Sequence, residues 1–153
     1  MALETGLLID HAETIERLTA LLDAQWPDWY NPRGASARTD LSERMRRDGL
    51  PLGIVALVDG EVAGTCAVTA GSGGVVTERS PWLSGLVVAP EMRRRGVGRA
   101  MLGRARQEAR RLGHQWIYAL TADAAGLFEA EGWVEVDRIE VAGVPHRVFR
   151  ARA

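Results

Sequence analysis

The stretch VVAPEMRRRGVGRAML, residues 87–102, decides the fold of this 153-residue chain. An apolar strand leads through Pro90 to three arginines and to Gly96 and Gly98, and an amphipathic helix follows as far as Leu112. The start of a helix leaves backbone N–H groups unpaired and carries partial positive charge. Glycines let a ligand approach the backbone closely, and arginines add charged hydrogen bonds. The stretch therefore predicts a site for a phosphate or pyrophosphate.

Two other glycine-rich phosphate motifs do not fit this loop. The dinucleotide fingerprint G-x-G-x-x-G requires a third glycine where the chain has Met101. The P-loop requires a lysine after its second glycine, and the chain contains no lysine. A solvated, arginine-rich helix start without any ligand stays open as an alternative, because short glycine motifs are weak signals on their own.

Composition indicates an ordinary globular protein. Hydrophobic residues make up 46% and charged residues 25%, and the net charge of −1 gives no general attraction to nucleic acid or to an anionic membrane. The single cysteine, Cys66, excludes an internal disulfide and favours a reducing compartment. No signal-peptide pattern and no run of about eighteen apolar residues is present. We therefore expect one cytoplasmic domain over residues 1–153.

The order of the predicted elements indicates an α/β fold with mixed strand directions. The dipeptide Asp59-Gly60 favours a tight hairpin turn, Asp10 offers an N-cap for the first helix, and residues 27–36 read as a loop. The expected strands are 5–9, 52–58, 61–70, 82–89, 115–120, 133–141 and 146–152, and the expected helices are 12–26, 36–48, 97–112 and 123–131.

The arginine loop and a second element downstream resemble the GNAT superfamily of N-acetyltransferases. Its signature is Arg or Gln, two residues, Gly, any residue, then Gly or Ala, and Arg93, Gly96 and Gly98 occupy the defining positions. YALTADAAGLFEAEGWVEV (118–136) matches the second element, which is a strand, a short helix and an aromatic residue after a glycine. The resemblance covers about residues 5–150. It implies a single-domain GNAT-like fold with a twisted, mixed and mostly antiparallel sheet of about six or seven strands, splayed at the acetyl-CoA site and flanked by about four helices.

The resemblance also implies where acetyl-CoA binds. Pantetheine would pair with backbone groups of the strand before the loop, and the amides from Arg94 to Arg99 would bind the pyrophosphate. Ser84-Gly85 lies where this strand usually bulges, and glycine suits a bulge. The implied cofactor-binding residues are Leu86, Val87, Val88, Arg93, Arg94, Arg95, Gly96, Val97, Gly98, Arg99, Thr121 and Phe128. No metal is expected.

Acetyl transfer from a thioester to an amine needs a neutral amine, a stabilised oxyanion and a proton for the leaving thiolate. By resemblance, the backbone N–H of Val88 would donate to the thioester oxygen. Phe128 stands where many relatives have the tyrosine that protonates the thiolate, and Thr121 stands where an asparagine is often found. Glu78 and Thr121 are candidate catalytic residues, although a solvated loop acid and a strand-closing residue are the ordinary alternatives. Water could carry the proton.

The acceptor site of such proteins draws on the loop between the first two helices and on the last hairpin. Trp26, Trp29 and Tyr30 lie in that loop and His146 lies in the hairpin, so these four residues are candidates for binding the acceptor. Exposed aromatic residues can form a wall for an apolar or cationic substrate. The alternative is that Trp26 and Trp29 anchor the first helix to the sheet. No clear acidic patch marks a polycationic acceptor.

These observations predict an acetyl-CoA-dependent N-acetyltransferase that acts on a primary amine of a small molecule or peptide by direct attack on the thioester. Because the usual tyrosine is absent, a non-catalytic or weakly catalytic acyl-CoA-binding regulatory module is the alternative. The expected partners are acetyl-CoA and an amine acceptor, with a homodimer as a further option. Nucleic acid and membrane are not expected partners, because the arginines at 93–111 stand in a neutral background without interleaved aromatic residues.

Overall fold

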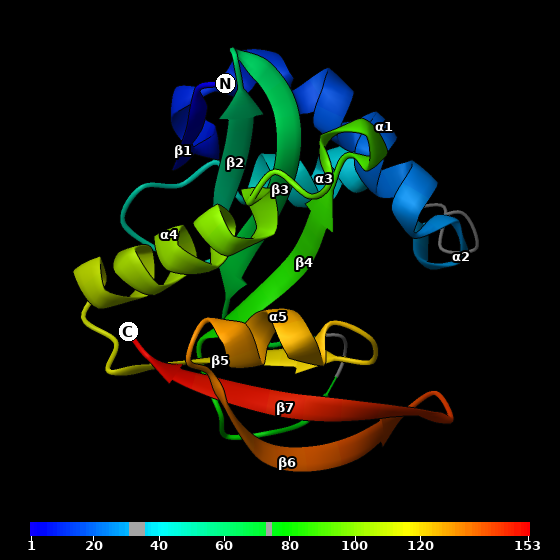
Figure 1. The fold of residues 1–153 in the computed structure, drawn as a ribbon, viewed down its shortest axis with the longest axis vertical. Coiled ribbons are helices and arrows are strands. Elements are labelled where there is room, and N and C mark those ends of the chain that lie inside the picture. Colours follow the sequence, from blue (N-terminus) through cyan, green and yellow to red (C-terminus); the bar gives the residue numbers. More distant parts are fainter. Residues whose placement is uncertain (31–35, 73–74) are drawn as a thin grey trace.

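The computed structural model of the protein describes residues 1–30, 36–72 and 75–153, which form one twisted seven-stranded sheet with flanking helices (Figure 1). The strand order is β1-β2-β3-β4-β5-β7-β6. Neighbouring strands are antiparallel except β4 and β5, which are parallel. The predicted mixed, mostly antiparallel sheet is confirmed. The strands are β1 (Leu3–Leu7), β2 (Leu52–Val58), β3 (Glu61–Thr69), β4 (Trp82–Val88), β5 (Trp116–Thr121), β6 (Val134–Val141) and β7 (Val144–Arg152).

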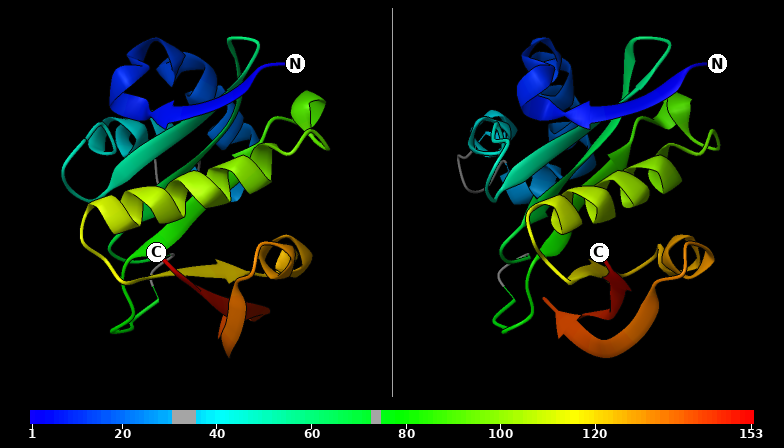
Figure 2. Two further views of the ribbon diagram at one scale, coloured as in Figure 1. Left: turned by 60° about the vertical axis from the view of Figure 1, so that its left-hand side comes forward. Right: turned by 90° about the vertical axis from the view of Figure 1, so that its left-hand side faces the viewer.

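Helices cover both faces of the first four strands. The α-helices of the described ranges are α1 (Ile15–Gln25), α2 (Pro27–Tyr30), α3 (Ala37–Glu43), α4 (Val97–Arg111) and α5 (Ala125–Ala130), and the 3-10 turns are η1 (Leu8–Asp10), η2 (Ala12–Thr14) and η3 (Pro90–Met92). Helix α4 packs on one face of β1–β4, and α1 and α3 lie on the other (Figure 2). Every residue of β2 is consequently buried. Each described helix is too short or too polar to span a lipid bilayer.

Two local patterns position the strands and α4 as predicted. Asp59 and Gly60 have φ angles of 51° and 83°, the positive values of a tight hairpin turn, and β2 therefore pairs directly with β3. The apolar stripe of α4, which includes Val97, Met101 and Ala105, is buried against the sheet. This packing fixes the start of α4 beside the end of β4.

The first helix starts later than predicted, and Asp10 does not cap it. Residues 8–14 form the turns η1 and η2, and α1 begins at Ile15 without a side-chain cap. Both Nη atoms of Arg47 donate hydrogen bonds to the Asp10 carboxylate, which is therefore engaged by a residue 37 positions away. Arg47 also holds the pKa of that carboxyl below its usual value, chiefly through this hydrogen bonding.

The segment between α1 and β2 also departs from the prediction. Pro27 begins the short helix α2 where a loop was expected, because proline already has a helical φ and no N–H to leave unpaired. The rest of that predicted loop up to residue 35 lies outside the described residues. Helix α3 ends at Glu43 rather than at 48, since the carbonyl of Arg44 accepts the N–H of Gly53 (2.8 Å) and so joins β2 instead of extending the helix.

Candidate active site

The sheet is splayed between β4 and β5. These strands pair only at Trp82↔Tyr118 and Leu83↔Ala119, although β4 continues to Val88. Over its last residues β4 stays paired with β3 but has no strand partner on its β5 side. The backbone groups on that edge are therefore available to a ligand, as expected for an extended chain lying in the gap.

A bulge in β4 sits at the point of divergence. Ser84 is opposite Ala67 and Val87 is opposite Thr65, so two residues of β4 face the single residue between them on β3. Gly85 has a φ of +62°, a value that glycine adopts without strain. The bulge predicted at Ser84-Gly85 is confirmed, and it turns the end of β4 away from β5.

A cleft of about 320 Å³ occupies the gap. Its walls come from the bulged part of β4, the end of β5 with the turn after it, and α5. The lining residues are Trp26, Ser72, Leu83, Ser84, Gly85, Leu86, Leu120, Thr121, Ala122, Asp123, Ala124, Phe128 and His146. Of the residues implied to contact the cofactor, Leu86, Thr121 and Phe128 line this cleft.

The phosphate loop lies between η3 and α4. Arg94 and Gly96 have φ angles of 63° and 78°, and Gly96 is the N-cap of α4 without a side-chain cap. The N–H of Ala100 donates to the carbonyl of Gly96 (3.0 Å) in the first helical hydrogen bond, so the N–H groups of the three preceding residues have no helical acceptor. A Cβ at Gly96 would meet no atom within 4 Å. Open space, unpaired N–H groups and the exposed side chains of Arg93, Arg94 and Arg95 fit the predicted pyrophosphate.

Gly98 lies where the phosphate loop comes close to the cleft. A Cβ built at Gly98 lies 3.3 Å from Cδ2 of Leu127 on α5 and 4.0 Å from Cγ2 of Val88 at the end of β4. The start of α4 thus approaches both walls of the splay. Arg99 points elsewhere, because its Nε donates to the Glu131 carboxylate (3.1 Å). Val97 is buried, so only its backbone can serve a ligand.

The candidate catalytic residues occupy different places. Thr121 is buried at the end of β5, and its hydroxyl accepts a hydrogen bond from the N–H of Ala124 (2.8 Å), which closes the turn into α5. Phe128 is buried, with its ring stacked on Phe149 and edge-on to Trp133 (centroids 5.5 and 5.1 Å apart). Glu78 is exposed in the segment before β4 and does not line the cleft.

A second cavity of about 440 Å³ opens beside the cleft and gathers all four residues predicted to bind the acceptor. The two cavities share part of one wall, including Ser84 and Gly85. We call the second cavity the acceptor pocket. It is lined by Trp26, Trp29, Tyr30, Asp40, Arg44, Thr69, Gly71, Ser72, Ser84, Gly85, Leu120, Val141 and His146.

Tyr30 is held by an acid in this pocket. Its hydroxyl donates to Oδ2 of Asp40 (3.0 Å). Burial, followed by the Asp40 charge and this hydrogen bond, raises the pKa of Tyr30 to about 12. The phenol is therefore protonated at neutral pH, and Asp40 already has a partner.

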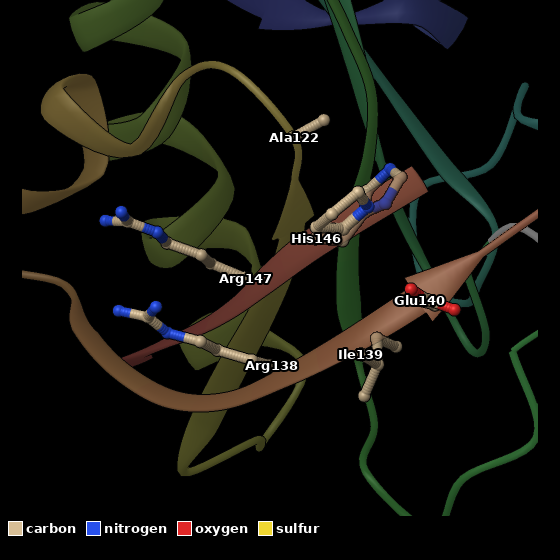
Figure 3. Close-up of a pocket in the computed structure, with 7 residues that line it drawn as sticks. Ala122, Arg138, Ile139, Glu140, His146 and Arg147 are labelled. Atoms are coloured by element: carbon tan, nitrogen blue, oxygen red, sulfur yellow. The ribbon is translucent and has the colours of Figure 1, made fainter. Parts of the chain in front are cut away.

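His146 stands where the cleft and the acceptor pocket meet. Its Nδ1 lies 2.8 Å from the carbonyl oxygen of Val144. A carbonyl only accepts, so Nδ1 carries the hydrogen and Nε2 of the neutral ring has a free lone pair. His146 also borders a third cavity, of about 400 Å³, on the outer side of the last hairpin, where Arg138 and Arg147 extend from paired positions of β6 and β7 (Figure 3). The ring of His146 therefore lies beside both inner cavities.

Arg44, which follows the end of α3, was not among the residues predicted from the sequence. Its guanidinium lies against the bulge, because a Cβ at Gly85 would be 3.4 Å from Nη1. That Nη1 is buried and has no hydrogen-bond partner among the described residues. Arg44 has three arginine neighbours within eight positions, Arg38, Arg46 and Arg47, so no sequence signal distinguishes it.

Neither a metal site nor a nucleophilic thiol accompanies these cavities in the described part of the chain. No three His, Cys, Asp or Glu side chains gather there to hold a metal ion. Cys66 is fully buried, and burial raises the pKa of its thiol to about 12. The polar groups that the two cavities do offer are backbone groups, one histidine and the polar side chains that line them.

Comparison with known proteins agrees with this geometry. The acetyltransferase (GNAT) family model matches residues 18–133, whereas a search of curated proteins found no match. Among solved structures, aminoglycoside 6′-acetyltransferase type Ii aligns with a TM-score of 0.75 at 19% identity, over 99% of this chain and 97% of that one. The aminoglycoside 6′-N-acetyltransferase from Enterococcus faecium aligns at 0.75 and 16%, over 99% and 97%. An aminoglycoside 6′-N-acetyltransferase complexed with coenzyme A aligns at 0.73 and 14%, with the same coverage. The TM-scores show a shared fold, and the family match over most of the sequence shows that this chain belongs to the GNAT family of acetyltransferases, which use acetyl-CoA.

Proposed function

We propose that the protein is an N-acetyltransferase that transfers the acetyl group of acetyl-CoA to a primary amine of a small molecule or peptide. The observation that carries this proposal is that the acceptor pocket and the splayed cleft share a wall that includes the bulge. An amine in the pocket and a thioester in the cleft would therefore both lie beside Ser84 and Gly85.

Backbone groups and the arginine loop would hold the donor. The open edge of Leu86–Val88 would pair with the pantetheine arm, and the N–H groups of Val97, Gly98 and Arg99 would take the pyrophosphate. Arg93, Arg94 and Arg95 would add charge around the phosphates. When bound, acetyl-CoA supplies the thioester whose carbonyl carbon the amine attacks.

The Val88 N–H is suited to donate to the thioester oxygen. The N–H of Ala89 donates to the carbonyl of Ala63 on β3 (2.8 Å). Successive N–H groups of a strand point to opposite edges, so the N–H of Val88 faces away from β3 and toward the cleft. A fixed N–H donor at a developing negative charge is a large contribution to such reactions.

His146 would serve as the base. Its Nε2 lone pair would accept the proton that the amine must lose, and the hydrogen bond of Nδ1 to Val144 keeps the ring in the required tautomer. Phe128 has no proton to give, so water in the cleft would relay to the leaving thiolate the proton that His146 takes from the amine. Thr121 would support the turn beside the cleft through its bond to Ala124.

The proposal is tested by incubating the protein with acetyl-CoA and a panel of primary amines, and by following free CoA and acetylated products by mass spectrometry. We expect product from at least one amine, and a kcat lowered by about 10²-fold or more in His146→Gln, within the usual range for a general base. If acetyl-CoA raises the melting temperature but no amine is acetylated, the protein is instead the acyl-CoA-binding regulatory module.

A further inference from the structure

We propose that Arg44 binds a carboxylate of the acceptor, so that the acetylated amine belongs to a carboxylate-bearing molecule of the size of an amino acid. This inference rests on the proposed N-acetyltransferase function and narrows its substrate class. It excludes polycationic acceptors and peptide N-termini that have no carboxylate near the amine.

The first observation is an arginine without an anion. Arg44 is half-buried, its Nη1 is fully buried, and no described residue accepts a hydrogen bond from that atom. Other arginines in comparable surroundings have acids: Arg104 and Arg111 both donate to Glu108, and Arg79 donates to Asp137. A guanidinium withdrawn from water without a partner is unfavourable, and a bidentate carboxylate is the group that its planar fork matches best.

The second observation is where this guanidinium lies. It borders the acceptor pocket and packs against Gly85, which lines the pocket and the cleft alike. Gly85 leaves room there, since a Cβ would come within 3.4 Å of Nη1. A carboxylate on Arg44 would therefore place the rest of a short molecule at the wall shared with the cleft, within reach of His146.

The charges around the pocket also favour a carboxylate-bearing acceptor over a polycationic one. Asp40 is the only acid among the described residues that line the pocket, and its Oδ2 accepts a hydrogen bond from the hydroxyl of Tyr30. A polycation would meet the charge of Arg44, and among the described lining residues only Asp40 could oppose that charge, which disfavours a polycation. A pocket of about 440 Å³ suits a small molecule, and Trp26 and Trp29 give it aromatic walls.

The experiment compares matched acceptors on matched variants. Wild type, Arg44→Gln, Arg44→Lys and the control Arg46→Gln are assayed with the proteinogenic L-amino acids, their carboxamides, spermidine and an aminoglycoside. Arg46 lies two positions along the chain, is exposed, and does not line the pocket. Each variant is first checked for its melting temperature and for its shift with acetyl-CoA, which shows that fold and donor site are intact.

We expect wild type to prefer one or more carboxylates over the corresponding carboxamide by at least about tenfold in kcat/KM, the value of one charged hydrogen bond. Arg44→Gln should abolish that preference, Arg44→Lys should restore part of it, and Arg46→Gln should keep it. Equal rates on carboxylate and carboxamide, a preference for spermidine or the aminoglycoside, or an unchanged preference in Arg44→Gln would each overturn the inference while leaving the proposed function intact.

Absence of turnover with every amine would contradict the proposed function instead. Whether Arg44 binds a carboxylate is then tested by calorimetric titration of the same amino acids and carboxamides into the CoA-loaded protein. Carboxylate-selective binding that Arg44→Gln removes and Arg46→Gln retains supports the site. Binding without that selectivity, or no binding, overturns it.

Discussion

Replacing Gly98 with valine is expected to weaken CoA binding strongly while leaving the fold intact. A Cβ at this position already lies 3.3 Å from Leu127 and 4.0 Å from Val88, so the two methyl groups of valine must push against α5 or occupy the space above the loop. Either outcome separates the phosphate from the backbone N–H groups at the start of α4. Loss of one charged hydrogen bond costs about 1.5–3 kcal/mol, which corresponds to a rise of roughly 10- to 150-fold in Kd.

The effect is measured as a thermal shift. At a CoA concentration of about 100 times the wild-type Kd, binding stabilises the protein by about 2.7 kcal/mol, which raises the melting temperature by roughly 5–10 °C for a chain of this size. After a hundredfold loss of affinity the same concentration contributes only about 0.4 kcal/mol, or roughly 1–2 °C.

The control lies in the same helix. Gly103 is exposed on α4, and a Cβ there would meet no atom within 4 Å. Gly103→Val should therefore keep the full CoA shift while making the same chemical change in the same helix. A wild-type shift in Gly98→Val, or an equal loss in both variants, would refute the assignment of the phosphate to this loop.

Three further outcomes are expected. Phe128→Tyr should raise kcat roughly tenfold or more, because its hydroxyl can protonate the thiolate; an unchanged kcat assigns that proton to water. The pKa of the Cys66 thiol is about 12 in the folded protein, whereas its ordinary value is 9.0, so the unfolded state loses this proton first. The free energy of unfolding should therefore fall as pH rises from about 9 to about 12. In urea denaturation over this pH range, Cys66→Ala should show a smaller decrease in the free energy of unfolding. Glu108→Gln should lower the free energy of unfolding by about 2 kcal/mol. Breaking a fully buried ion pair costs roughly 3–5 kcal/mol, and the cost is smaller here because the side chains of Arg104 and Arg111 reach solvent. A change under about 0.5 kcal/mol in urea denaturation would contradict this.

Local patterns were sufficient for most of the fold. The turn at Asp59-Gly60, the apolar stripe of α4 and the glycines of the arginine loop each act within a few residues, and the structure contains all three where the sequence predicts them. Local patterns fail where a residue far away along the chain determines the structure. Asp10 has the right chemistry for an N-cap, yet Arg47, 37 residues away, engages its carboxylate.

The acceptor side shows the same limit. The resemblance to GNAT proteins implied a group made of Trp26, Trp29, Tyr30 and His146, and the structure brings these four residues into one pocket. Arg44 was not predictable. The direction of the Arg44 side chain depends on where α3 ends and on the hydrogen bond that the Gly53 N–H donates to the Arg44 carbonyl. Neither feature can be read from a sequence with several neighbouring arginines.

The short seam between β4 and β5 also sets a limit on how stable this protein can be. In the strand ladder, β1–β4 and β5–β7 are joined at two paired positions, and Trp82 contacts Tyr118 beside them. Substitutions that lengthened the ladder would add hydrogen bonds and rigidity, but they would close the gap that receives the donor under the proposed function. Under the proposed function, selection for thermostability alone would favour variants in which β4 and β5 pair along their full length, and these variants would lose activity. The short pairing between β4 and β5 is therefore a place where stability is lower than it could be for the sake of function.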